Sequence, residues 1–205
     1  MAAGPSPLVV VVVVVFVLSA ATLELIRPAA SFSISIGIGN QHQQDEEDAP
    51  AAAEGHSFTG GRGTYKYMAH EFLEAHNRVR ARYGMQPLRW NNKLARYARR
   101  WSAARRFDCV LMHSPESPYG ENVFWGTGWD WRAGDAVSSW ASEAASYDWR
   151  AQTCHAGQMC GHFTQLVWND TELVGCGRAE CVAGGVFITC SYDPPGNWQG
   201  EVPLT

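Results

Sequence analysis

Apolar residues recur at helical spacing in three segments of the chain. The first stripe ends at Gly84, which predicts an amphipathic helix carrying Met68, Phe72, Ala75, Val79 and Tyr83. A second helix is predicted after Asn91 or Asn92, either of which can cap it, with one face formed by Leu94, Tyr97, Ala98 and Trp101. A third is predicted to follow Gly134, with Asp135 as its N-cap, and to bury Val137, Trp140, Ala141 and Ala144.

The hydrophobic period changes from 3.6 to 2 towards the C-terminus. His162, Thr164, Leu166 and Trp168 alternate with Phe163, Gln165 and Val167, which predicts a half-buried strand. Two further strands are predicted over residues 172–181 and 186–192, with a turn at Ala183-Gly184-Gly185 between them. Helices followed by an antiparallel sheet are typical of an α+β fold in which the helices cover the sheet.

The N-terminal segment has the pattern of a signal peptide. Residues 8–18 form an unbroken apolar run, and the small residues Ser19, Ala20 and Ala21 follow it. The run is shorter than the roughly 20 residues that a spanning helix needs, which favours cleavage. No Lys or Arg precedes the run, so an uncleaved signal anchor stays open. We expect residues 1–21 to be a signal peptide and the protein to be secreted.

Residues 22–63 differ in composition from the rest of the chain. They are rich in Gly, Ser, Ala and Gln and contain the acidic cluster 45–48. Such a segment buries too little apolar surface to offset its ordering entropy, so we predict a disordered, acidic and Gly-rich linker. This interpretation leaves residues 64–205 as one folded domain.

The linker also masks the charge of the domain. The whole chain has a net charge of −4, whereas from Gly61 onward 15 Lys and Arg stand against 14 Asp and Glu, a balance of +1. Ten of these basic residues lie between Arg78 and Arg106, with no acid among them. A basic face can attract anionic partners, but solvated arginine faces on two helices explain the pattern more simply. No nucleic-acid motif accompanies the charge, so we expect no nucleic-acid partner.

All six cysteines lie in the C-terminal half of the chain. An even number in a secreted chain predicts three disulfides, and the residues alone leave 15 pairings open. A catalytic thiol is disfavoured because no cysteine is left over, and a structural zinc site is disfavoured because no CxxC pair occurs.

Four segments carry a resemblance to a known family: 118–122 (PYGEN), 154–160 (CHAGQMC), 161–168 (GHFTQLVW) and 187–198 (FITCSYDPPGNW). They resemble the CAP superfamily of cysteine-rich secretory proteins, antigen 5 and pathogenesis-related protein 1, and fit the plant pathogenesis-related 1 branch best. The resemblance implies that residues 64–205 form a CAP (SCP) domain, a three-layer α-β-α sandwich with a central antiparallel sheet. It also implies the disulfides Cys109–Cys181, Cys154–Cys160 and Cys176–Cys190.

The resemblance further implies a cleft lined by His113, Glu121, Glu143 and His162, which we call the tetrad. Two carboxylates in one cleft repel each other, so a proton, a charged histidine or a cation must compensate. His113 and His162 suit a divalent ion such as Zn²⁺, with the glutamates as ligands or as groups that orient the rings, although no cofactor is required. Metal-assisted hydrolysis is the alternative. The chain lacks HExxH and GxSxG motifs, and we expect no enzyme activity.

For function, the resemblance implies a secreted defence protein that binds sterols or other lipids. In a plant, the extracellular space in which it would act is the apoplast. The expected lipid contacts are Tyr147 and Trp149 in the stretch 144–149, together with Trp140. An aromatic-rich loop adds Phe124, Trp125, Trp129 and Trp131. Tryptophans at such spacing fit a core equally well. Besides the lipid, we expect a microbial or membrane-associated target and a monomeric protein.

Two further features concern processing. Asn169-Asp170-Thr171 is a glycosylation sequon. In some plant relatives the C-terminal tail resembles a releasable signalling peptide, which here corresponds to residues 194–205. Ser191 replaces the Asn that usually stands before this tail, and the ending also departs from the usual one, so a tail packed on the sheet is an equal alternative.

Overall fold

The computed structural model of the protein describes residues 57–203, so the expected signal peptide and most of the expected linker lie outside the described residues. Its main sheet has the order β1-β5-β6-β2, formed by β1 (Arg89–Trp90), β2 (Gly120–Gly126), β5 (Leu173–Glu180) and β6 (Val186–Asp193). β5, β6 and β2 run antiparallel, and only the two-residue edge strand β1 pairs in parallel. A separate ribbon joins β3 (Tyr147–Asp148) to β4 (Thr153–Cys154).

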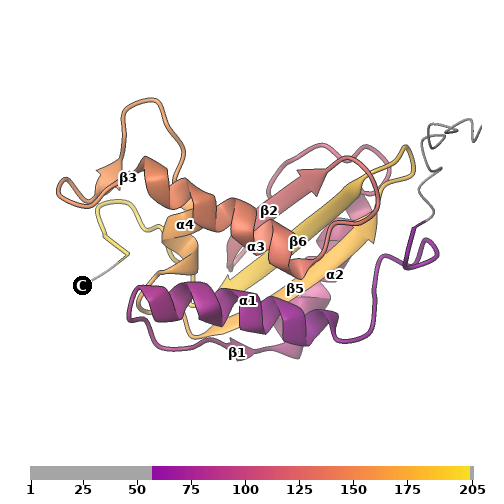
Figure 1. Ribbon diagram of the computed structural model, residues 1–205, viewed down its shortest axis with the longest axis horizontal. Coiled ribbons are helices and arrows are strands. Elements are labelled where there is room, and N and C mark those ends of the chain that lie inside the picture. Colours follow the sequence, from indigo (N-terminus) through magenta and orange to yellow (C-terminus); the bar gives the residue numbers. More distant parts are fainter. Residues whose placement is uncertain (1–56, 204–205) are drawn as a thin grey trace, which may run out of the picture. The chain divides into compact units, whose positions relative to one another are not determined.

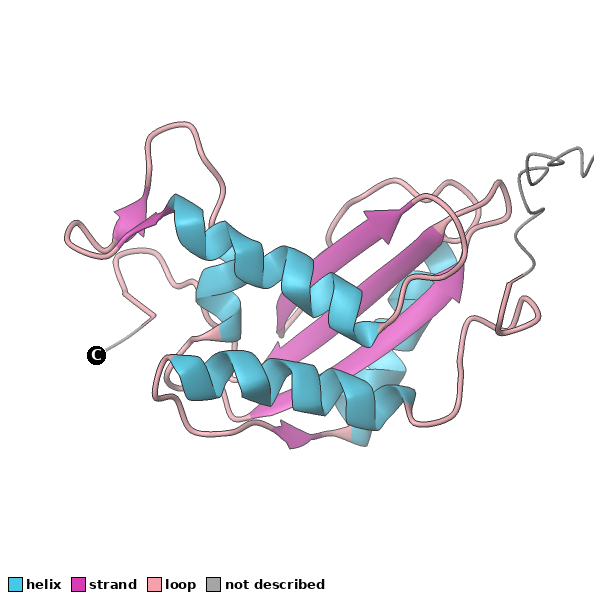
Figure 2. Cartoon of the chain, viewed as in Figure 1, coloured by secondary structure: helices cyan, strands magenta, loops and turns pink. Residues whose placement is uncertain are grey.

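Helices cover both faces of this sheet, which confirms the α+β, three-layer arrangement. α1 (Met68–Arg82) and α3 (Ala133–Ser142) lie on one face, and α2 (Asn92–Arg105) lies on the other, behind the sheet in the view of Figures 1 and 2. The 3₁₀ turn η1 (Glu143–Ser146) continues α3 towards the β3–β4 ribbon. Under this turn lies the short helix α4 (Gly161–Leu166).

The three helices predicted from periodicity are all present. Asn91 caps α2, because its Oδ1 accepts hydrogen bonds from the N–H groups of Lys93 (2.8 Å) and Leu94 (3.2 Å). Asp135 is not the N-cap of α3. The helix begins two residues earlier, and Asp135 accepts a 2.7 Å hydrogen bond from the Arg132 N–H within the first turn.

The strand predicted over residues 162–168 is wrong, because this segment contains α4. All of residues 163–168 are buried. The alternation of polar and apolar residues therefore does not mark a strand with one solvent-exposed and one buried face. Phe163, Leu166 and Val167 have the i, i+3, i+4 spacing of a helix, which was masked by the polar residues Thr164 and Gln165. Both of these polar side chains find hydrogen-bond partners inside the fold.

The strand that completes the sheet is β2, which the periodicity did not predict. It pairs with β6 along its whole length, and Glu121 lies opposite Ser191. Phe124 and Trp125, which we had expected in an aromatic loop, belong to this strand. Four of its seven residues are buried, so the strand contributes to the core as well as carrying Glu121.

Close approach of α2 to β5 depends on two glycines. A Cβ atom at Gly175 would lie 2.2 Å from the Ala95 nitrogen, and one at Gly177 would lie 2.4 Å from the Arg99 nitrogen. Both obstacles are backbone atoms, which cannot rotate away. The helix can therefore lie flat on the sheet only because these positions have no side chain.

Two arginines are buried and tie separate segments together. Arg80 donates hydrogen bonds to the carbonyls of Gln86, Leu166, Trp168 and Thr171, and so fixes α1 to the end of α4. Burial lowers the pKa of Arg80 to about 10. Arg178 on β5 binds the carbonyls of Gly63, Trp129 and Trp131. The expectation that arginines only form solvated faces is therefore wrong for Arg80.

Part of the expected linker is packed on the domain. The hydroxyls of Ser57 and Thr59 both donate to the Glu180 carboxylate, the former at 2.6 Å. The Gly63 carbonyl accepts from Arg178 at 2.8 Å. Residues 57–63 are thus held against β5, so a linker reaching residue 63 is wrong for this segment.

All three disulfides implied by the family resemblance are present: Cys109–Cys181, Cys154–Cys160 and Cys176–Cys190. The last joins directly opposed residues of β5 and β6, whereas the first closes a separation of 72 residues. Among the described residues, no helix is both long enough and apolar enough to span a bilayer.

Candidate functional site

The tetrad is organised as two separate histidine–glutamate pairs. In the first, Nδ1 of His113 lies 2.9 Å from Oε1 of Glu121 on β2. The N–H and hydroxyl of Ser114 also donate to this carboxylate, at 2.9 and 2.7 Å. The Glu121 side chain is only 4% exposed, whereas that of His113 is 60% exposed. The buried glutamate therefore holds the histidine at the surface.

The second pair joins η1 to α4. Nδ1 of His162 lies 2.6 Å from Oε1 of Glu143, and Oε2 accepts from the backbone N–H groups of His162 (2.9 Å) and Phe163 (3.4 Å). Burial acts to raise the pKa of Glu143, but the hydrogen bonds and charge of His162 outweigh it and lower that pKa. Glu143 therefore accepts from free N–H groups at the start of α4 as well as from the ring.

These hydrogen bonds fix the tautomer of both histidines. An ionised carboxylate can only accept, so each ring donates from Nδ1, and Nε2 of the neutral ring keeps a lone pair. Within the described part of the chain, neither Nε2 has a hydrogen-bond partner. A carboxylate that orients an imidazole through Nδ1 in this way also occurs beside metal-binding histidines.

A cavity of about 310 Å³ brings most of the tetrad together. Its walls include three members of the tetrad, and the full lining is His113, Glu121, Asn122, Cys154, Met159, Cys160, Gly161, His162 and Asn197. Glu143 is not part of the wall and reaches the cavity only through His162. In the structure, distant segments of the chain bring the two imidazoles to one hollow, and Glu143 lies behind the His162 ring.

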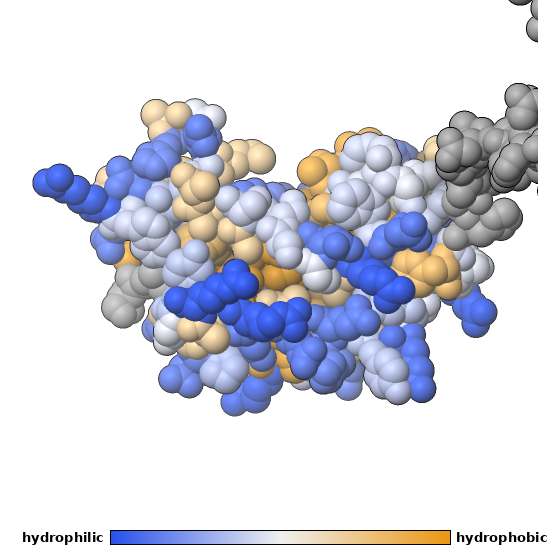
Figure 3. Space-filling model, viewed as in Figure 1, coloured by the Kyte–Doolittle hydropathy of each residue, from blue (hydrophilic) through white to orange (hydrophobic). Residues whose placement is uncertain are grey.

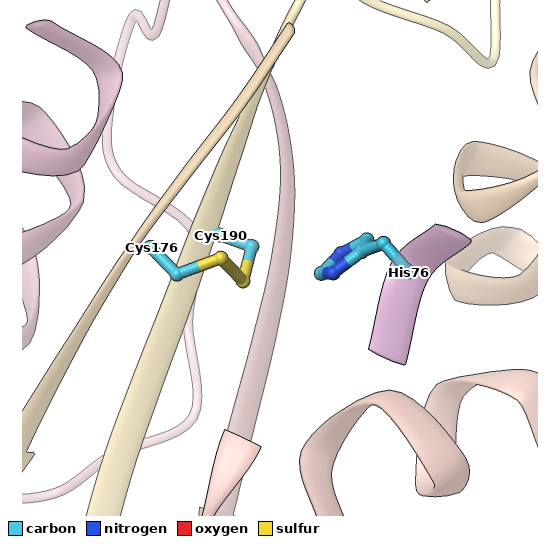
Figure 4. A group of neighbouring side chains, drawn as sticks. All are labelled: His76, Cys176 and Cys190. Carbon is cyan, nitrogen blue, oxygen red and sulfur yellow. A yellow bond between two sulfur atoms is a disulfide. The ribbon is translucent and has the colours of Figure 1, made fainter. Parts of the chain in front are cut away.

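The ligand atoms of the tetrad do not lie close enough together in the described structure to form a compact metal site. Among residues 57–203, only one group of three or more His, Cys, Asp or Glu side chains has all its ligand atoms within 4.8 Å, namely His76, Cys176 and Cys190. Its two sulfurs form a disulfide, towards which the His76 ring points (Figure 4), so no thiolate is available to a metal.

His76 has a structural role in the core instead. It is fully buried, its Nδ1 is 2.7 Å from the Phe72 carbonyl, and its Nε2 is 2.8 Å from the Tyr192 hydroxyl. Burial lowers the pKa of His76 to about 4, so the ring is neutral at ordinary pH. Nδ1 then donates to Phe72 and Nε2 accepts from Tyr192.

Of the three expected lipid contacts, only Trp149 has an exposed side chain. Trp140 and Tyr147 are buried, and Trp140 donates from Nε1 to the Val123 carbonyl at 3.0 Å while its ring stacks on His162. Trp149 is exposed and stacks on Tyr83 with ring centroids 5.5 Å apart. Trp140 therefore supports the tetrad from the core and is not available to a ligand in this conformation.

Most side chains of the expected aromatic loop are also packed against the rest of the fold. Phe124 is buried, and the Trp131 ring packs against it at 5.0 Å. Arg178 fixes the backbone carbonyls of Trp129 and Trp131. Of the four aromatic residues, only Trp125 is largely exposed, so this segment is part of the fold and does not form an open ligand surface.

A groove of about 290 Å³ runs between α1 and α3. Figure 3 shows apolar residues between the two helices, with strongly hydrophilic side chains in front of them. The lining combines small and apolar residues with two arginines: Ala75, Val79, Gly134, Val137, Ser138, Ala141 and Ser142, with Arg78 and Arg82. Periodicity could not reveal it, because it belongs to two helices whose packing is not encoded locally.

The C-terminal tail and the sequon have defined positions. Asn169 is exposed in the turn after α4, not at the end of a strand, and its N–H donates to the Pro203 carbonyl. Asn197 bonds to Thr164 and to the Gly161 carbonyl, and the Gly196 N–H donates to Gln165. The described tail is therefore bound mainly to α4.

Comparisons with known proteins agree with this architecture. The family model described as "Cysteine-rich secretory protein family" (CAP) matches residues 73–192. The pathogenesis-related protein PR-1 of Medicago truncatula is 48% identical over 134 residues, which cover 65% of this chain and 77% of the relative.

Two solved structures show the same fold at low identity. The venom allergen-like protein 4 of Schistosoma mansoni has a TM-score of 0.55 and 23% identity, covering 69% of this chain and 96% of that chain. The crystal structure of NaASP2 with Zn²⁺ has a TM-score of 0.55 and 20% identity, covering 70% and 87%. The length of the family match and the identity to the plant relative establish that this chain belongs to the cysteine-rich secretory protein (CAP) family and is similar to plant pathogenesis-related protein 1.

Proposed function

We propose that the protein is an exported, pathogenesis-related 1-like defence protein that binds an amphiphilic lipid in the groove between α1 and α3. Its relatives carry pathogenesis-related names, and three disulfides suit the extracellular space, which in a plant is the apoplast. The groove is the observation that carries the lipid proposal.

The lining of this groove fits a lipid with an acidic head. Val79, Val137 and Ala75 are buried apolar residues that can contact an acyl chain. Arg82 is exposed at the rim and has no ion-pair partner within residues 57–203. A guanidinium in this position can bind a carboxylate head group. The volume of about 290 Å³ lies near the lower end of the roughly 300–1,000 Å³ typical of small-ligand sites.

A binding assay with a labelled fatty acid and a labelled sterol tests this proposal. Ala141→Trp should fill the groove and abolish saturable fatty-acid binding, and Arg82→Gln should weaken it about fivefold. Ala103→Trp is the matched control, because Ala103 is exposed on α2 and does not line the groove. Binding that survives Ala141→Trp, or no saturable binding of either lipid, would contradict the groove assignment.

A second candidate function is divalent-cation binding through His113 and His162. The two oriented rings with free Nε2 atoms favour it, and NaASP2 has been crystallised with Zn²⁺. The donor set fits zinc, although no three ligand atoms of the tetrad are gathered within 4.8 Å in the described structure. Bound zinc would act as a Lewis acid. The glutamates would orient the rings without serving as ligands.

Hydrolysis is less well supported than binding. Both oxygens of Glu121 and both oxygens of Glu143 already accept hydrogen bonds from protein donors. A general base must be free to take a proton from water or substrate. We therefore propose that the glutamates are positioning residues and that the protein is not an enzyme.

A further inference from the structure

A second surface feature is independent of the groove and the tetrad. The loop after α2 exposes four apolar side chains, and the neighbouring β5–β6 turn exposes a fifth. Their exposed fractions are 77% for Phe107, 54% for Val110 and Leu111, 44% for Met112 and 63% for Val182. We call these five residues the apolar tip. Contiguous exposed apolar residues commonly mark an interaction surface.

The backbone of this tip is firmly held. The Cys109–Cys181 disulfide joins the loop to the end of β5, and the Val182 N–H donates to the Arg106 carbonyl at 2.8 Å. Trp101 donates from Nε1 to the Met112 carbonyl at 3.0 Å. The apolar side chains are therefore exposed by a fixed backbone rather than by a loop that could fold inward.

The charge around the tip is basic. Arg99, Arg100 and Arg106 are exposed, and Arg99 and Arg106 lie on the same side because seven residues make two helical turns. Asp108 is the only acid between residues 93 and 112, and it pairs with Arg105. The nearest acid on β5, Glu180, is buried and paired with Arg178. Arg106 thus lies directly before Phe107 without an ion-pair partner among residues 57–203, and Arg99 and Arg100 add exposed positive charge on α2.

We propose that the apolar tip docks on the surface of an anionic phospholipid bilayer. Phe107 and Leu111 would enter the boundary between head groups and acyl chains, while the arginines bind the phosphate layer. Exposed apolar side chains combined with cationic ones are an arrangement that peripheral membrane proteins use at an anionic leaflet. An acidic protein surface would satisfy the arginines but would not require such strongly exposed aliphatic and aromatic side chains.

Vesicle co-sedimentation of the full, oxidised protein tests this proposal. The vesicles contain phosphatidylcholine alone or phosphatidylcholine with phosphatidylserine, at low and high salt. We expect binding only to the anionic vesicles, weakened by salt. The double variant Phe107→Ser/Leu111→Ser should bind at least about tenfold more weakly. Arg106→Gln should bind about fivefold more weakly, since one basic residue at an anionic surface contributes about that factor.

Matched controls separate this site from general effects. Tyr67→Ser removes an exposed aromatic residue elsewhere, and Arg150→Gln removes an exposed charge elsewhere, so both should bind like the wild type. Thermal unfolding verifies that each variant is folded, and Val182→Ser, at an exposed residue of the tip, replaces the double variant if that one is not folded. The proposal is overturned if the protein does not bind anionic vesicles, or if the tip variants and the control variants bind them equally. Tip-dependent dimerisation in sedimentation velocity without vesicle binding also overturns it.

Discussion

His162 and Glu143 are joined both through the imidazole ring and through the backbone, although 19 residues separate them in the chain. Oε1 lies 2.6 Å from the ring Nδ1, and Oε2 accepts the backbone N–H of the same histidine at 2.9 Å. One carboxylate therefore fixes both the orientation of the ring and the start of α4. This double contact makes Glu143 a structural residue as well as a member of the tetrad.

Replacing Glu143 should accordingly reduce stability. Glu143→Ala leaves the His162 and Phe163 N–H groups without their acceptor, and we expect a loss of about 1–3 kcal/mol in the free energy of unfolding. Glu143→Gln keeps an acceptor oxygen and should lose less than half of that. Urea unfolding at neutral pH measures both. Equal stability of wild type and Glu143→Ala would show that the carboxylate does not support α4.

Cation binding should depend on both histidines. Calorimetric titration with Zn²⁺ should give binding to the wild type that is lost in His113→Ala and in His162→Ala. Glu143→Gln should weaken it about 10–100-fold, because the carboxylate orients the ring. His70→Ala is the control, since His70 is an exposed residue of α1 outside the cavity. Loss of binding in only one histidine variant would argue against a shared ion.

Stability should decrease in mild acid because of His76. The pKa of His76 is about 4 in the folded protein against 6.5 for an ordinary histidine. Between these values the unfolded chain binds a proton that the folded protein does not, so stability falls as pH falls. The shift corresponds to about 3 kcal/mol across this window.

Urea unfolding of the wild type and His76→Gln between pH 7 and pH 4.5 measures this effect. His76→Gln should be less stable at pH 7, because it disturbs the contacts with Phe72 and Tyr192, but should show a shallower pH dependence. His70→Gln should keep the wild-type slope. An unchanged slope in His76→Gln would mean that other groups cause the acid sensitivity.

A methyl group at Gly177 should separate α2 from the sheet. Gly177→Ala places Cβ about 2.4 Å from the Arg99 backbone nitrogen, and overpacking of this kind costs about 1–3 kcal/mol. Gly134→Ala is the matched control, because no atom lies within 4 Å of its Cβ position in α3. It should be neutral or stabilise by up to about 1 kcal/mol. Thermal unfolding distinguishes the two variants.

The secondary structure was predictable from the sequence where a residue's environment depends on its neighbours in the chain. The three long helices follow from apolar stripes, and Asn91 was recognisable as a cap because capping needs only the next few residues. β5 and β6 were recognisable from apolar runs bounded by a glycine turn. The disulfide pairing was predicted only through the family resemblance, because the residues alone left 15 pairings open.

The errors occurred where long-range packing overrides a local pattern. α4 resembles a strand because Thr164 and Gln165 are polar, yet both are buried and hydrogen-bonded. Arg80 resembles a surface residue in a basic segment, but carbonyl groups from residues 86–171 surround it. In each case the partners lie on other elements, so no window of sequence contains the information.

The sequence by itself determined the three long helices, two of the strands and an even set of cysteines, and through the family resemblance it supplied the four residues expected in the tetrad. Only the tertiary structure decided that the tetrad is two hydrogen-bonded pairs, that Trp140 supports His162 from the core, and that a groove separates α1 from α3. The physical reason is that hydrophobic periodicity depends on local backbone geometry, whereas burial, tautomer and cavity shape depend on contacts between elements far apart in the chain.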